Sequence, residues 1–199
     1  MSEERREIAA DDILSLDDYA EVRDARRREI IDLKRERRLA VGPYATFYFE
    51  SYRTMLQQIQ EMYWIEKGGP EQIADELAAY NPLVPQGDEL VATVMFEIED
   101  EARRRQFLLG LGGVEETMAI EVDGTRVAGV PEVGDQVERT AADGKTSSIH
   151  FMHFRFPPEA IARFREPGAR VVVAVEHENY AHMAVMPEAV RRALAEDFA

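Results

Sequence analysis

The chain contains no cysteine among its 199 residues. Without thiols it can form no disulfide, use no cysteine nucleophile and hold no iron–sulfur cluster through its own side chains. A chain without disulfides suits a reducing compartment, where such bonds are rare. We therefore expect a cytoplasmic protein in which any electron transfer depends on a bound metal or on a partner's cofactor.

Long apolar runs and several catalytic motifs are missing too. No stretch approaches the roughly 20 apolar residues of a membrane-spanning helix, so we expect no membrane partner. The sequence lacks the G-x-S-x-G elbow of serine hydrolases and the G-x-x-x-x-G-K-[ST] phosphate loop. The first 80 residues contain no histidine, which excludes the Glu-x-x-His pairs of a ferritin-like di-iron bundle.

Positive charge is scarce, because 24 Lys and Arg stand against 39 Asp and Glu and leave a net charge of −15. So acidic a chain repels phosphate backbones, and we expect no nucleic-acid partner. Residues 23–38 are the exception, with eight basic and four acidic side chains. A basic helix there could bind RNA or an acidic partner, but the interleaved acids favour intramolecular ion pairs and a solvated face.

The first 82 residues are predicted to form a helical layer. Ser15 and Asp18 resemble a capping box, and the apolar spacing predicts helices over 15–41, 44–67 and 70–80. The apolar residues at helical spacing are Leu16, Tyr19, Val22, Ile30 and Leu33, then Tyr48, Tyr52, Met55, Ile59, Met62 and Tyr63, then Ile73, Leu77 and Tyr80. Glycine or proline follows each of these segments and is expected to end it.

After residue 88 the apolar period becomes that of a strand. Strands are predicted at ELVATVMFEIE, in the hairpin TMAIEVDGTRVAGV, at SSIHFMHFRF and at RVVVAVE. Asp123–Gly124 and Asp143–Gly144 suit tight hairpin turns, which imply an antiparallel sheet. Further helices are predicted at DEARRRQFLLG, after Pro157–Pro158 and after Pro187.

The expected fold is therefore α+β in one compact unit. An N-terminal helical layer fills residues 1–82, and a mainly antiparallel sheet with packed helices fills residues 83–199. No internal repeat and no low-complexity segment divides the chain further.

All four histidines fall between residues 150 and 182. The segment from His177 to His182 resembles the H-E-x-x-H pattern of zinc hydrolases but fails it by one residue. A separation of five residues turns the second histidine roughly 140° around a helix, away from the first. The segment also follows a β-branched run, so we expect a strand that runs into a turn or loop.

A metal site is one hypothesis for these histidines. If the strands of His153 and His177 pair, the two imidazoles could approach each other, with Glu178, Tyr180 or His182 added from the turn. Such a set suits one iron, manganese or zinc ion. The alternative is a group of partly buried histidines whose nitrogens bond to backbone or carboxylate groups. The sequence assigns no catalytic residue.

Four stretches carry a family resemblance: RRLAVGPYATFYFESYRTMLQQIQEM, ELAAYNPLVP, ELVATVMFEIE and EHENYA, in this order. They are similar to the uncharacterised bacterial family catalogued as the domain of unknown function numbered three thousand five hundred and one. The resemblance spans nearly the whole chain and carries no assigned chemistry, so it transfers no catalytic residue. It implies a gene neighbourhood with a rubrerythrin-like protein and an iron–sulfur oxidoreductase, and so work beside a peroxide- or redox-handling system.

Two functions of different classes follow. The favoured one is a non-catalytic accessory protein that binds a redox protein through its acidic surface and helical layer, as a monomer or a homo-oligomer. The other is a metal-dependent oxidoreductase or metal-binding protein, in which the histidines hold the ion and a carboxylate or phenol transfers protons. The first predicts a salt-sensitive complex, and the second predicts stoichiometric metal.

Overall fold

The structure, a computed structural model, describes residues 5–132 and 145–199. The strands in this part of the chain are β1 (Arg38–Val41), β2 (Ala45–Phe49), β3 (Glu89–Phe96), β4 (Met118–Val122), β5 (Thr125–Ala128), β6 (Val130–Pro131), β7 (Ile149–Arg155), β8 (Val171–His177) and β9 (Tyr180–Val185). The α-helices are α1 (Leu16–Arg35), α2 (Tyr52–Glu66), α3 (Pro70–Tyr80), α4 (Glu101–Leu109), α5 (Pro158–Arg165) and α6 (Glu188–Leu194). The 3₁₀ turns are η1 (Ala10–Asp12), η2 (Asn81–Leu83), η3 (Val114–Thr117) and η4 (Ala195–Asp197).

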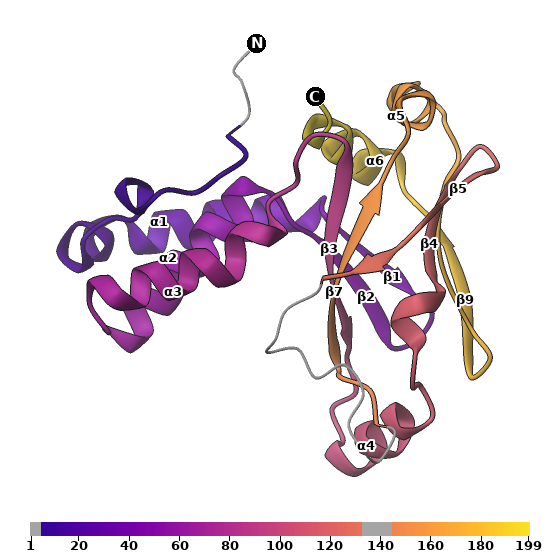
Figure 1. Cartoon of the computed structure of the whole chain (residues 1–199), viewed down its shortest axis with the longest axis horizontal. Helices are drawn as coiled ribbons and strands as arrows, with labels where there is room; N and C mark the ends of the chain where they lie inside the picture. The colour runs from indigo at the N-terminus through magenta and orange to yellow at the C-terminus, as the bar shows by residue number, and fades with distance from the viewer. Residues whose placement is uncertain (1–4, 133–144) are drawn as a thin grey trace.

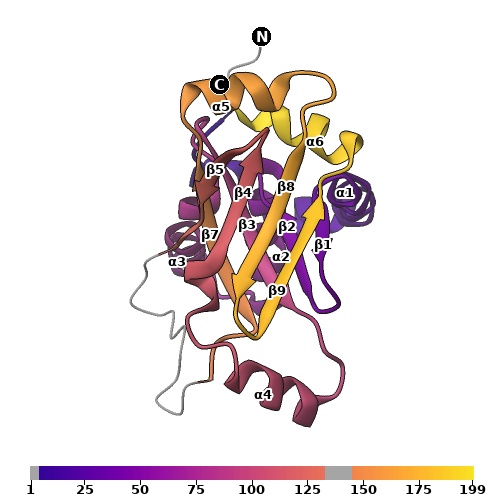
Figure 2. The same cartoon turned by 90° about the vertical axis from the view of Figure 1, so that its right-hand side faces the viewer.

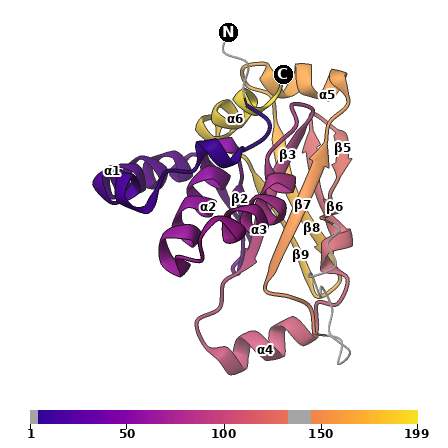
Figure 3. The ribbon, with the colours of Figure 1, turned by 60° about the vertical axis from the view of Figure 1, so that its left-hand side comes forward.

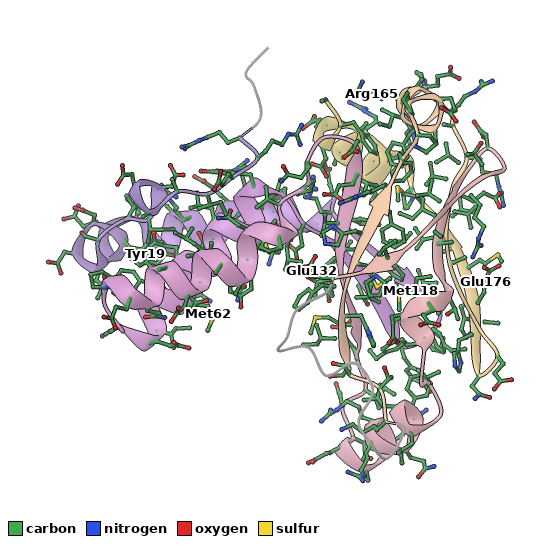
Figure 4. All side chains as sticks on the ribbon, in the orientation of Figure 1. Tyr19, Met62, Met118, Glu132, Arg165 and Glu176 are labelled. Carbon is green, nitrogen blue, oxygen red and sulfur yellow. The ribbon has the colours of Figure 1, made fainter. Side chains whose placement is uncertain are left out.

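The strands form two antiparallel sheets that face each other (Figure 1). Sheet one has the order β1-β2-β3-β7-β6, and sheet two has the order β5-β4-β8-β9. Side chains that alternate along each strand fill the space between the sheets, as Leu90, Ala92 and Val94 of β3 do. Met118 of β4 enters the same core from the other sheet (Figure 4). The α+β fold predicted from the sequence is confirmed.

The two sheets are joined along one side and adjacent along the other. β5 pairs with β4 in sheet two, and directly after Gly129 the chain enters β6 and pairs with β7 in sheet one. A Cβ atom on Gly129 would lie 2.8 Å from the ring of Phe154 and 2.9 Å from Met152, so only glycine fits this crossing. On the opposite side β1 lies beside β9. The core is therefore enclosed on both sides.

Helices close the two ends of the sheet pair (Figures 1 and 2). α5 and α6 lie at one end, where Phe156, Phe164 and Phe198 pack edge to face with ring centroids 5.1–5.8 Å apart. A buried ion pair between Arg37 and Asp197 ties the C-terminal turn to the start of β1. α4 lies at the other end.

The first three helices, α1, α2 and α3, form a helical arm that projects from the outer face of sheet one (Figure 3). Ser51 and Thr54 form a capping box at the start of α2, and Pro70 occupies the first turn of α3. The base of the arm is apolar, because Met55 and Ile59 of α2 pack in one cluster with Val91 of β3. The rest of the arm extends beyond the sheet.

The prediction of a wholly helical N-terminal region is wrong. The first helix ends at Arg35, and the two short strands β1 and β2 follow. Gly42 adopts a φ of 73° in the turn between these strands and does not end a helix. β2 pairs with β3, so residues 1–82 and residues 83–199 contribute to the same sheet.

The segment after His177 is also more ordered than predicted. The turn consists of Glu178 and Asn179 alone, and the chain returns at once as strand β9. The hairpin at Asp123–Gly124 is confirmed, with φ values of 46° and 88° at its two turn residues. The turn predicted at Asp143–Gly144 lies outside the described residues.

Candidate functional site

The residues predicted to bind a metal lie on two different sheets, and the strand pairing on which that prediction depended is wrong. β7, which carries His153, lies between β3 and β6, whereas β8, which carries His177, lies between β4 and β9. Figure 4 shows the neighbours Glu132 and Glu176 of these two histidines on opposite sides of the sheet pair. Among residues 5–132 and 145–199, no group of three or more His, Cys, Asp or Glu side chains is placed to hold a metal ion.

His153 lies between two carboxylates on the outer face of sheet one. Its Nδ1 is 3.0 Å from Oε2 of Glu89, and its Nε2 is 2.7 Å from Oε2 of Glu132. The second contact is an ion pair when the imidazole is protonated. Burial lowers the pKa of His153, but the hydrogen bond and charge of Glu89, together with Glu132, outweigh burial and raise it. The imidazole therefore links three parts of one sheet.

Tyr180 closes the side of the molecule where β1 lies beside β9. Its buried hydroxyl donates a hydrogen bond to the carbonyl of Val41 at 2.7 Å. The same oxygen accepts hydrogen bonds from the backbone N–H groups of Tyr44 at 3.0 Å and Ala45 at 2.9 Å. Burial raises the pKa of Tyr180, so the phenol keeps its proton and its role as a donor. This tyrosine fastens the β1–β2 turn to the β8–β9 hairpin.

The remaining residues of that hairpin contact backbone and aromatic groups. His177 Nε2 lies 3.3 Å from the carbonyl oxygen of Gly112, and its Nδ1 accepts a hydrogen bond from Asn179 N–H at 3.2 Å. The Asn179 side chain donates to the carbonyl of Gly110 at 2.9 Å. The ring of His182 lies 4.4 Å from that of Tyr180, while Glu178 is exposed in the turn. These contacts favour the alternative of structural histidines.

A polar network holds α1 against α2 at the far end of the arm. Tyr19 donates a hydrogen bond to Oε1 of Glu61 at 2.6 Å, and Arg23 binds both carboxylate oxygens of Glu61 at 2.9 and 2.8 Å. The hydrogen bond from Arg23 lowers the pKa of Glu61. Burial and the hydrogen bond to Glu61 raise the pKa of Tyr19 to about 12. Gln57 completes the network by bonding to the Tyr19 hydroxyl.

A groove of about 470 Å³ lies beside this network, between α1 and α2. It is lined by Val22, Ala25, Arg26, Glu29 and Ile30 of α1 and by Arg53, Leu56 and Gln57 of α2. Ile30 also borders a second groove of about 200 Å³, which is lined as well by Arg27, Ile31 and Lys34 of α1 and by Gln57, Gln58 and Glu61 of α2. Together these two hollows are called the arm groove.

The arm groove combines apolar exposure with positive charge. Val22 is 36% and Ile31 is 55% exposed, although both are large aliphatic side chains. Tyr19 is the one buried residue of α1 in a helix of 20 residues. The first ten residues of α1 carry four acids and one base, whereas the last ten carry five bases and two acids. The groove therefore lies towards the basic half of a bipolar helix.

Comparison with known proteins places nearly the whole chain in one family. The pattern of the family described as "Protein of unknown function (DUF3501)" matches residues 7–198. The chain belongs to the DUF3501 family. A crystal structure of a protein of unknown function from Burkholderia pseudomallei K96243 is similar to this DUF3501 chain, with 33% identity and a TM-score of 0.87. The similarity covers 96% of this chain and 99% of that one. No curated protein matches the chain.

From the sequence of this DUF3501 protein the histidines were the candidate site, and the groove between α1 and α2 was not predicted. Intramolecular ion pairs and a solvated face were predicted for residues 23–38. Arg23 does form an intramolecular pair, with Glu61 of α2, while Arg26 lines the groove between α1 and α2. The signal for the groove in the sequence is that Arg26 lies four residues from both Val22 and Ile30. Within the described ranges, no helix is both long and apolar enough to cross a membrane.

Proposed function

We propose that the chain is a non-catalytic accessory protein that binds an acidic, partly apolar segment of a partner protein along the arm groove. The observation that carries this proposal is the composition of the groove, in which arginines stand beside exposed aliphatic side chains. Arginine is among the residue types that contribute most to protein–protein affinity, and the aliphatic side chains beside it add apolar surface that a partner could bury.

Charge supports an acidic partner. The side chain of Arg26 lines the groove and forms no hydrogen bond or ion pair with any other described residue, so its charge is available to a ligand. The ion pair between Arg53 and Glu29 spans 3.8 Å across the groove between exposed side chains and is easily broken. Carboxylates of a partner could pair with these guanidinium groups bidentately.

We infer that the partner is a redox protein and that the complex forms in the cytoplasm. The family resemblance supports this inference through its implied rubrerythrin-like and iron–sulfur neighbours. The lack of cysteine supports it as well, because electron transfer would then depend on the partner's cofactor. In this role the chain positions or protects the partner and performs no chemistry of its own.

The experiment measures binding of a purified rubrerythrin-like protein by titration calorimetry at low salt. The double variant Arg26→Glu and Arg27→Glu is expected to bind at least ten-fold more weakly than the parent, about 1.4 kcal/mol, because two attractive charges become repulsive. Arg163→Glu is the control for a single charge reversal elsewhere and is compared with Arg26→Glu alone, since Arg163 is an exposed arginine of α5, far from the arm groove. Unchanged affinity in the double variant would refute the proposed groove.

Metal analysis separates this proposal from the competing metal-site hypothesis. Plasma mass spectrometry on untagged protein should give the same metal content for the parent and for His177→Ala if the histidines are structural. Iron, manganese or zinc near one ion per chain in the parent, lost in the variant, would instead support a metal-dependent function.

A further inference from the structure

A pocket of about 460 Å³ lies at the end of the sheet pair that α4 occupies, opposite α5 and α6 (Figure 2). One wall is formed by α4 and the other by residues 145–148, which lead into β7. The backbone N–H of Thr146 donates a hydrogen bond to the carbonyl of Leu108 at 3.1 Å and so joins the two walls. We call this hollow the α4 pocket.

The α4 pocket is basic, although the chain as a whole is acidic. Arg104 and Arg105 of α4 line it together with Lys145 of the opposite wall. Among the described residues of the lining, Glu101 is the one acid, which leaves an excess of two positive charges in a chain whose net charge is −15. A concave site with charge of one sign concentrates the local electric field and attracts ligands of the opposite sign. The class of ligand that fits is therefore an anion.

Arg104 is held in place and still has donors for a ligand. Its Nη1 donates a hydrogen bond to the carbonyl of Ile98 at 2.7 Å, which fixes the guanidinium group. Its Nε and Nη2 form no hydrogen bond with any described residue, although the side chain is half-buried. A guanidinium group that is already ordered loses little entropy when it binds an oxyanion.

Hydroxyl groups accompany these charges. Ser147 Oγ accepts a hydrogen bond from the N–H of Ile149 at 3.1 Å, so its own hydrogen remains available to donate. The hydroxyl of Ser148, which is half-buried, forms no hydrogen bond with any described residue. Phosphate oxygens accept hydrogen bonds from hydroxyl groups as readily as from arginine and lysine. The pocket thus combines the donor types that a phosphate group uses.

We propose that the α4 pocket binds a small phosphorylated metabolite through its phosphate group. A phosphate monoester carries roughly two negative charges and three acceptor oxygens, which suits basic side chains set beside hydroxyl donors. A carboxylate has only two oxygens, which a single arginine can bind. A long polyanion such as nucleic acid would be repelled by the rest of this acidic chain.

The size and the lining of the pocket describe the rest of the ligand. A volume of about 460 Å³ lies within the usual range of small-molecule sites, roughly 300–1,000 Å³. Leu108 is the one apolar side chain among the described residues of the lining, and none of these residues has an aromatic ring that could stack on a base. The body of the ligand should therefore be polar, like a sugar, and not a nucleobase.

The α4 pocket is separate from the arm groove, so this inference does not rest on the proposed protein partner. The pocket lies at an end of the sheet pair, whereas the arm groove lies between α1 and α2 (Figure 3). Basic side chains line the arm groove as well. Phosphate bound at the arm groove is therefore the main competing explanation for any binding.

Titration calorimetry of the full chain with ribose 5-phosphate, at low salt and in a phosphate-free buffer, measures the binding. Arg104→Gln should bind about ten-fold more weakly than the parent, because the charge and the fork of the guanidinium group are lost. Arg103→Gln is the matched control, since it removes the same charge from the preceding position of α4, whose exposed side chain does not line the pocket. It should bind within about two-fold of the parent.

A second variant tests the hydroxyl donors and keeps the test decisive if Arg104→Gln fails to fold. Ser148→Ala should bind ribose 5-phosphate about five-fold more weakly, because it removes one donor and no charge. Inorganic phosphate should bind more weakly than ribose 5-phosphate in the parent, and acetate more weakly still. Saturating ribose 5-phosphate should slow amide hydrogen exchange in α4 and in residues 145–148 and leave α1 unchanged.

Several results would overturn the proposal. A parent that binds no ribose 5-phosphate would do so, as would unchanged binding in both Arg104→Gln and Ser148→Ala. Equal losses in Arg103→Gln and Arg104→Gln would reveal a general effect of charge, and slower exchange in α1 instead of α4 would place the phosphate in the arm groove. Inorganic phosphate or acetate that binds as tightly as ribose 5-phosphate would exclude a phosphorylated metabolite as the ligand.

Discussion

The hydroxyl of Tyr180 allows a sharp prediction about stability. Tyr180→Phe removes one oxygen and keeps the ring, so the aromatic contacts with Phe96 and Phe107 are preserved. The oxygen makes three hydrogen bonds to backbone groups of Val41, Tyr44 and Ala45. Each such bond contributes about 1 kcal/mol net, so the variant should lose about 3 kcal/mol of unfolding free energy. Backbone groups left unpaired can only increase this loss.

Chemical and thermal unfolding measure the effect. For a chain of this size about 3 kcal/mol corresponds to a decrease in Tm of roughly 6–12 °C. Tyr44→Phe is the matched control, because the Tyr44 ring stacks 6.5 Å from that of Tyr180 while its hydroxyl bonds only to the exposed Arg103. The control should lose less than about 0.5 kcal/mol. If Tyr180→Phe loses less than about 1 kcal/mol, or no more than the control, then the hydroxyl does not fasten the two hairpins.

Three further predictions concern the other contacts. Gly42→Ala should lower the free energy of unfolding by about 2–5 kcal/mol, because the new Cβ would lie 2.5 Å from the His182 ring at a φ of 73°. Gly124→Ala is the control: its φ is 88° but the space around it is open, so it should lose only the backbone contribution of about 1–2 kcal/mol in the same unfolding assay. The unfolding free energy that His153 adds over His153→Gln should be complete below pH 6.5 and lost as pH rises through the raised pKa of His153. Burial raises the pKa of Glu89 but His153 lowers it further, so the stability that the Glu89 carboxylate contributes is present above pH 4.5 and lost as pH falls through that lowered pKa. Equal pH profiles of unfolding in parent and variant would contradict the pairing. Glu61→Gln should lower the free energy of local unfolding of α1 by about 2 kcal/mol, so amide hydrogen exchange in α1 should become faster while the sheets keep their protection. Unchanged exchange in α1 would show that the network does not hold the helix.

The sequence predicted elements wherever one local pattern prevailed. β3 and β7 followed from their two-residue apolar period, β8 from a β-branched run, and the Asp123–Gly124 hairpin from turn chemistry. β1 and β2 were missed because they have only four and five residues and adjoin long helices, so that their two-residue period was lost in the helical one. Short strands next to a glycine turn are recognised only when their partner strand is known.

The candidate sites show a different limit. The metal hypothesis required β7 to pair with β8, and strand partners depend on contacts between residues far apart in the chain. Likewise Arg23 pairs with Glu61, which lies 38 residues further along the chain, and no rule of sequence spacing connects the two. The basic character of residues 23–38 was visible, but the exposure of Val22 and Ile31 beside it depends on how α2 packs.

The bond between Tyr180 and Val41 also has a consequence for how the chain folds. It joins residues 139 positions apart, so closing β1 against β9 carries a large loop-closure entropy. During synthesis the β1–β2 hairpin leaves the ribosome long before β9 exists, and it must wait with one edge unsealed. Folding should therefore be slow for a chain of this length, with sealing of this edge as a late step.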